Sequence, residues 1–196
     1  GTGAPSYVQV VPTELVLKPG QRVSLKARLF DDKGLFLREE QAAWSLDGLK
    51  GTIGNDGMFI ASNDPEGQAG LIKATLNGIT GEARARISHP LPWTEPFTSF
   101  ADGAIPPGWV NAQAGKVSVT TLDGQKVLQK APDDTIFKRA RVFFGPTDWS
   151  NYTFQADVRA PERRRQMGDV GITAQRYSLV LYGTSQQLKI EPWEPE

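Results

Sequence analysis

The stretch Asp148–Gly183, DWSNYTFQADVRAPERRRQMGDVGITAQRYSLVLYG, decides the fold class of this chain. In its first part every second residue is apolar, and these residues are Tyr152, Phe154, Ala156 and Val158. A period of two is typical of a β-strand that buries one face. A basic loop and two further strand patterns follow, so we expect the first strand to share a core with Leu179 and Leu181. The pattern predicts a β-sandwich and contains no catalytic or metal-binding motif.

Composition excludes several classes of function. The 196 residues carry 22 Lys and Arg against 22 Asp and Glu, which is not the charge balance of a nucleic-acid binder. The chain has no cysteine, so thiol catalysis, cysteine-bound metal and disulfides are excluded. His89 is the single histidine, which argues against a histidine metal site or catalytic triad. No apolar run approaches the roughly 20 residues that span a bilayer. We therefore expect no cofactor, metal, nucleic acid or membrane span.

The first half is a series of short strand patterns. Val23, Leu25, Ala27 and Leu29 alternate with polar residues, and the turn 31–34 follows them. Residues 71–76, the turn Asn77-Gly78 and the alternating residues 83–87 predict a hairpin. About seven short strands in this half indicate a small immunoglobulin-like sandwich.

The first half resembles the bacterial Ig-like domains of intimin and invasin type. The matching segments are VVPTELVLKPGQRVSLKARLFDDKG, WSLDGLKGTIGNDGMFIA and GLIKATLNGITGEARARI, which cover nearly all of residues 6–88. The resemblance implies a spacer or adhesive module that lacks the disulfide of antibody domains.

A proline-rich segment divides the chain. Three prolines stand in residues 90–96, and they favour a stiff, extended linker in which Trp93 can pack. The expected domains are therefore an Ig-like sandwich at 1–89, the linker at 90–96 and a second sandwich at 97–196.

The second half resembles the concanavalin A-like jelly-roll superfamily, in particular the lectin-like module of exported planctomycete-type proteins. Some of these are β-propeller proteins of the pyrroloquinoline quinone-binding type. The matching segments are LPWTEPF, IPPGWVNAQAGKVSV, LDGQKVLQK, GPTDWSNYTFQADVR, RRRQMGDVGITAQRYSLVLYG and QQLKIEPW, within residues 91–193. The resemblance implies an all-β chain of two tandem β-sandwiches, the second a partial jelly roll that is shorter than a complete one. We therefore expect an open sheet edge and an edge-strand dimer through residues 176–193.

Candidate ligand-binding residues lie in the second half. Glycosidase chemistry needs two facing carboxyl groups, for which Asp157 and Asp169 are the candidates, although a polar strand face and a turn cap explain them equally well. Saccharides stack on aromatic rings and bond to amides and guanidinium groups, and the candidates for this are Gln175, Arg176, Tyr182 and Trp193.

Other residues have structural explanations beside functional ones. Trp44 and Trp149 are expected in the cores. The arginines of the basic loop could cluster with Arg176 to bind an acidic glycan, or they could be solvated. Asp31-Asp32 and Asp133-Asp134 could bind calcium, but they have no EF-hand spacing, so turn capping is favoured.

The leading hypothesis is a noncatalytic, exported binding, adhesion or accessory module for carbohydrate or for a neighbouring domain of a longer protein. No signal peptide is visible, and the opening Gly-Thr-Gly is what a trimmed chain would show. The alternatives are a glycan-processing enzyme on the jelly-roll face and a purely structural appendage of a β-propeller. A single groove lined by Asp157, Asp169, Arg176 and Tyr182 would favour binding or catalysis, and scattered positions would favour the appendage.

Overall fold

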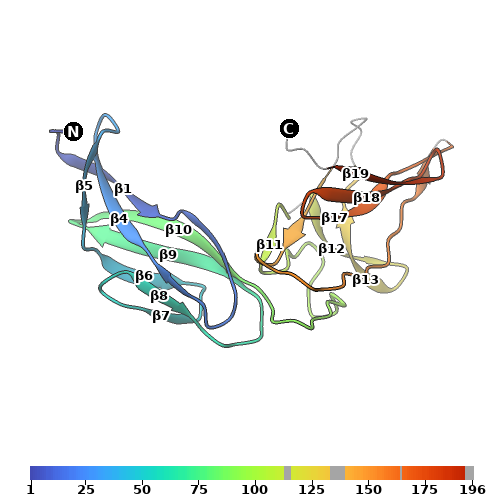
Figure 1. Cartoon of the computed structure of the whole chain (residues 1–196), viewed down its shortest axis with the longest axis horizontal. Coiled ribbons are helices and arrows are strands. Elements are labelled where there is room, and N and C mark those ends of the chain that lie inside the picture. The colour runs from blue at the N-terminus through green and yellow to red at the C-terminus, as the bar shows by residue number, and fades with distance from the viewer. Residues whose placement is uncertain (113–115, 133–139, 164, 193–196) are drawn as a thin grey trace. The chain divides into compact units, whose positions relative to one another are not determined.

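A computed structural model describes residues 1–112, 116–132, 140–163 and 165–192 (Figure 1). The described residues form strands and turns without a helix, so the predicted all-β fold is confirmed. They form two compact units, residues 1–146 and 147–196. The predicted boundaries at 89 and 97 stay a prediction.

Three sheets build the first part of unit 1. One has the order β1-β4-β5, one the order β2-β10-β9-β6, and one the order β3-β8-β7. Their strands are β1 (Pro5–Val11), β2 (Glu14–Leu17), β3 (Arg22–Ser24), β4 (Lys26–Asp31), β5 (Phe36–Glu40), β6 (Ala43–Asp47), β7 (Gly51–Ile53), β8 (Met58–Ala61), β9 (Gln68–Leu76) and β10 (Ile79–Ile87). All pairs are antiparallel except β2 with β10.

One hydrophobic core joins these sheets. Leu29 comes from β4, Phe59 from β8 and Ile72 from β9, and all three side chains are fully buried. Strands β9 and β10 alternate between buried and more exposed residues, as a sheet with one face on a core should. Trp44 is partly buried against this core, in line with its predicted position.

The predicted turns form as expected. Asn77 and Gly78 have φ angles of 49° and 82°, which suits the two central residues of a tight hairpin turn. In the turn after β4, Asp31 Oδ1 accepts hydrogen bonds from the backbone N–H groups of Lys33 (3.1 Å) and Leu35 (2.9 Å). The bond from Leu35 is the main reason that the pKa of Asp31 lies below its ordinary value. Turn capping therefore accounts for Asp31.

The rest of unit 1 contains short strands and an aromatic cluster. Strands β11 (Trp109–Val110) and β14 (Phe143–Phe144) pair, and β12 (Val117–Leu122) forms a hairpin with β13 (Gln125–Lys130). Val117 and Val119 are buried, as their alternation with polar residues predicts. Asp133-Asp134 lies outside the described residues.

Trp93 is the centre of the aromatic cluster. Its ring stacks on the His89 ring at 4.5 Å and 11°, and meets the rings of Phe144 (5.4 Å) and Trp109 (6.3 Å) edge-on. His89 Nδ1 lies 2.9 Å from the carbonyl oxygen of Pro65. These contacts anchor the proline-rich segment within unit 1.

Unit 2 contains a short hairpin and a three-stranded antiparallel sheet, drawn in red in Figure 1. The hairpin pairs β15 (Glu162–Arg163) with β16 (Gln166–Met167). The sheet has the order β17-β18-β19, with β17 at Val170–Ala174, β18 at Tyr177–Tyr182 and β19 at Gln187–Pro192. The two strands predicted after the basic loop therefore correspond to β17 and β18.

The strand predicted over residues 152–159 is wrong for this structure. The segment has no assigned strand, and Tyr152, Phe154 and Val158 are each about 40% exposed. Leu181 is also exposed, so the predicted shared core does not form either. An alternating segment becomes a strand only when a neighbouring strand accepts its backbone hydrogen bonds. Trp149 is half-buried and meets the Tyr152 ring edge-on, so it lies outside any described core cluster.

Candidate functional site

The β17-β18-β19 sheet of unit 2 positions most of the candidate residues, but at opposite ends. Asp169 precedes β17, and its Oδ1 accepts a hydrogen bond from the Gly183 N–H at 3.2 Å. Gln175 and Arg176 form the turn between β17 and β18, where Gln175 has a φ of 54°. A strand rises about 3.3 Å per residue, so the length of β17 separates Asp169 from Arg176 by more than 10 Å.

Tyr182 is engaged within the sheet. Its hydroxyl donates to Glu191 Oε1 at 2.7 Å, and Lys189 Nζ lies 5.0 Å from its ring centroid. These contacts join β18 to β19 and use the polar tip of the tyrosine. The Tyr182 side chain therefore stabilises the pairing of β18 with β19, and any contact with a ligand would be additional to this role.

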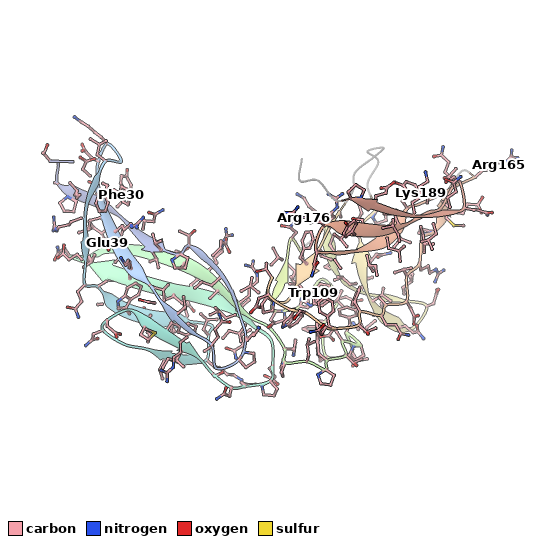
Figure 2. All side chains as sticks on the ribbon, in the orientation of Figure 1. Phe30, Glu39, Trp109, Arg165, Arg176 and Lys189 are labelled. Atoms are coloured by element: carbon pink, nitrogen blue, oxygen red, sulfur yellow. The ribbon has the colours of Figure 1, made fainter. Side chains whose placement is uncertain are left out.

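The remaining candidates lie elsewhere. Asp157 is an exposed residue of the unpaired segment before β15, and Trp193 lies outside the described residues. Figure 2 shows Arg165 and Arg176 far apart, at opposite ends of unit 2, so these two arginines do not form the cluster that the sequence offered as an alternative to a solvated loop. Among the described candidates, Asp169 and Tyr182 lie at one end of the sheet, since Val170 pairs with Leu181 and Asp169 bonds to Gly183, and Gln175 and Arg176 lie at the other end. Separated positions of this kind are the outcome that the sequence criterion assigned to the structural appendage.

The two faces of the sheet differ in chemistry. Cross-strand partners point to the same face of an antiparallel sheet. The register pairs Leu181 with Val170 and Leu188, and pairs Leu179 with Ile172 and Ile190. We call this surface the apolar face; it consists of Val170, Ile172, Tyr177, Leu179, Leu181, Leu188 and Ile190.

The opposite surface, the polar face, carries internal hydrogen bonds. The hydroxyls of Thr173 and Ser178 lie 2.9 Å apart, and the Tyr182–Glu191 bond is on the same side. The same side carries Lys189, which is labelled in Figure 2, and its Nζ lies 5.0 Å from the centroid of the Tyr182 ring. Polar groups of this face therefore bond to one another.

Much of the apolar face is exposed. The exposed fractions of its side chains are 44% for Leu181, 61% for Leu188, 62% for Tyr177 and 73% for Ile190. Ser178, on the polar face, is only 8% exposed. A sheet normally turns its apolar side toward a core, and the exposure of these four side chains departs from that rule. Sequence reasoning missed it, because the alternation Leu188-Lys189-Ile190-Glu191 identifies a strand without telling which side is covered.

Unit 1 contains a shallow depression lined by Pro96, Thr98, Gly124, Gln125 and Lys126. The ammonium group of Lys126 in this depression already has a partner, since its Nζ lies 2.5 Å from Asp102 Oδ1. The same carboxylate oxygen accepts a hydrogen bond from the Thr121 hydroxyl at 3.0 Å. Lys126 is the main reason that the pKa of Asp102 lies below its ordinary value. Asp102 is therefore ionised at neutral pH and is not suited to act as a general acid.

Further features of the described residues bear on metal binding, membrane association and buried polar atoms. In the described part of the chain, no group of three or more His, Asp or Glu side chains is placed to hold a metal ion. Among the same residues, no long apolar helix that could cross a membrane occurs. Trp109 Nε1 is buried without a hydrogen-bond acceptor in the described residues, inside the aromatic cluster.

Comparisons with known proteins were made with the whole sequence. No model of a known protein family matches the chain, and no curated protein matches it.

Proposed function

We propose that this chain is a noncatalytic accessory module that docks on a neighbouring protein domain through the apolar face of the β17-β18-β19 sheet. The observation that carries the proposal is the exposure of Tyr177, Leu181, Leu188 and Ile190 on one side of a sheet whose other side is internally hydrogen-bonded. Contiguous exposed apolar surface of this kind is typical of protein interaction sites.

The size of the face indicates what kind of partner fits. Full burial of one aliphatic side chain contributes about 1.5–3 kcal/mol. Scaled by the exposed fractions of Leu181, Leu188 and Ile190, complete covering contributes about 3–5 kcal/mol. Association of two separate molecules costs roughly 4–15 kcal/mol in lost freedom, so this face alone does not hold a free partner. A domain tethered on the same polypeptide is presented at an effective concentration of about millimolar, well above that of a dilute free partner, so a tethered domain is the favoured occupant.

The docking proposal can be tested in the full-length protein with a photo-crosslinking amino acid. Placed at Leu188, on the apolar face, it should label peptides of one neighbouring domain. Placed at Lys189, on the polar face of the same strand, it should not label that domain. Equal labelling from both positions, or labelling from neither, would refute docking through this face.

Carbohydrate binding is the second candidate, and one local arrangement favours it. Tyr177 is 62% exposed and directly follows Gln175 and Arg176 in the β17–β18 turn. An aromatic ring beside an amide and a guanidinium group has the composition of a saccharide site, and the resemblance to lectin-like modules supports the same role. A glycan-array screen of the full-length protein tests it: Tyr177→Ala should abolish any signal, and Tyr7→Ala, an equally exposed tyrosine of unit 1, should retain it.

A glycan-processing activity is less well supported. Asp169 caps the backbone at Gly183, and Asp157 lies on the unpaired segment before β15. Neither carboxyl is placed opposite the other across a described cleft. Export of the protein remains an expectation from its sequence, and detection of the mature chain outside the cytoplasm would test it.

A further inference from the structure

Strand β17 is an edge strand of the unit 2 sheet. Within the described residues, β17 is hydrogen-bonded on one side only, to β18. Gly171 of β17 is exposed, and because glycine has no side chain, the exposed atoms belong to the backbone. We propose that this edge pairs antiparallel with β17 of a second copy of the chain, which joins two three-stranded sheets into one sheet of six strands. The inference goes beyond the proposed docking function and does not depend on it.

The turn between β17 and β18 determines which backbone groups of β17 point to the open edge. This turn consists of the two residues 175–176, so Ala174 and Tyr177 close the hairpin as a hydrogen-bonded pair. Hydrogen-bonded and non-hydrogen-bonded pairs alternate along an antiparallel ladder, so every second residue of β17 bonds to β18. The N–H and C=O groups of Gly171 and Thr173, which lie between those residues, point toward the open edge.

These free backbone groups define the register of the pairing. A two-fold axis that passes between the Ile172 residues of two copies places Gly171 of each copy opposite Thr173 of the other. Each of the two pairs can exchange two backbone hydrogen bonds, which satisfies all the edge groups of Gly171 and Thr173 in both copies. A register shifted by one residue would set Gly171 and Thr173 opposite residues that already bond to β18.

The same register matches the side chains on both faces of the sheet. Ile172 lies opposite Ile172 of the second copy, and Val170 lies opposite Ala174, so the two apolar faces lie on the same side and become continuous. A slip of one residue would instead place Ile172 opposite Thr173 and mix apolar with polar side chains. The backbone groups and the side chains therefore select the same register.

Opposite charges at the two ends of β17 favour a second copy as the partner. Asp169 precedes the strand and Arg176 follows it, and within the described residues Arg176 makes no ion pair. The antiparallel pairing brings Asp169 of each copy opposite Gln175 and beside Arg176 of the other, so a carboxylate meets an amide donor and a cation at both ends. Strand β17 itself contains neither charge nor proline, the features that commonly protect an edge from pairing.

The absence of cysteine from the chain permits a disulfide test of this register. Ile172→Cys places two thiols beside the two-fold axis, in a non-hydrogen-bonded pair whose Cα atoms are about 4.5 Å apart and within disulfide reach. Ile190→Cys in β19 is the matched control, because Ile190 is 73% exposed and Ile172 is half-buried. Under mild oxidation Ile172→Cys should form the intermolecular disulfide at least about tenfold faster than Ile190→Cys, read by mass spectrometry. Equal rates, or faster linkage through Ile190→Cys, would overturn the proposal.

Two substitutions of Thr173 test the edge hydrogen bonds themselves. Thr173→Pro and Thr173→Val both remove the hydroxyl that lies 2.9 Å from that of Ser178, but only proline also removes the N–H that points to the edge. The symmetric dimer then loses two hydrogen bonds, so its dissociation constant in analytical ultracentrifugation should be at least about tenfold higher for Thr173→Pro than for Thr173→Val. Equal constants would overturn the proposal. An unsubstituted chain that stays monomeric up to about 1 mM would also overturn it, whether or not Thr173→Pro folds.

Discussion

Two isoleucines provide a matched test of which sheet faces are covered in solution. Ile72 in β9 is fully buried in the unit 1 core, and Ile190 in β19 is 73% exposed on the apolar face. Replacing Ile72 by alanine should cost about 2–5 kcal/mol, because it removes buried methyl groups and leaves a cavity. Only about a quarter of the Ile190 side chain is withdrawn from water, so the same replacement there should cost less than about 1 kcal/mol.

The assay must separate the two compact units, because a chain with more than one unit need not unfold in a single step. Urea denaturation followed by pulsed hydrogen exchange and mass spectrometry gives the free energy of unfolding separately for β9 and for β19. A cost above about 2 kcal/mol for Ile190→Ala would refute the reasoning, since the side chain would then be covered in solution. If that cost grew with protein concentration, the cover would be a second copy of the chain.

Three further predictions concern unit 1. Phe59→Ala should cost about 3–5 kcal/mol in urea denaturation, since Phe59 is fully buried, and Phe36→Ala, at a half-exposed site, should cost far less. The pKa values of Asp31 and Asp102 are lowered by the Leu35 amide and by Lys126, so the folded protein binds fewer protons than the unfolded chain. Their stabilisation is present above about pH 4 and is lost as the pH falls through the lowered pKa values, which acid titration followed by circular dichroism should show. Trp93→Ala removes the ring that stacks on His89, so small-angle scattering should show a broader range of chain dimensions, and an unchanged profile would contradict this.

The sequence was sufficient to predict the fold where a local pattern fixes a turn and the adjoining strands have one core to pack against. Asn77-Gly78 dictates a tight turn by its backbone preferences, and that turn fixes the register of β9 with β10. The alternating residues of both strands then have only one core to face. Turn capping by Asp31 is equally local, since its partners Lys33 and Leu35 are within four residues.

Prediction failed where the result depends on partners distant in sequence. Residues 152–159 alternate as clearly as β10 does, but alternation does not specify which strand supplies the hydrogen bonds. The relative positions of the candidate residues also depend on strand pairing. Asp169 and Arg176 are close in sequence, yet the five residues of β17 hold them at opposite ends of the sheet. Tyr182 bonds to Glu191 through a strand pairing that composition does not reveal.

The two edges of the unit 2 sheet are not equivalent, and this difference predicts where copies of the chain would meet. Edge strands are commonly protected by charge or proline. Strand β19 has both, with Lys189, Glu191 and Pro192, whereas β17 consists of Val, Gly, Ile, Thr and Ala. Charge and proline on β19 therefore disfavour the edge pairing through residues 176–193 that the sequence predicts. The edge of β17 has neither, so a further strand would pair there more readily.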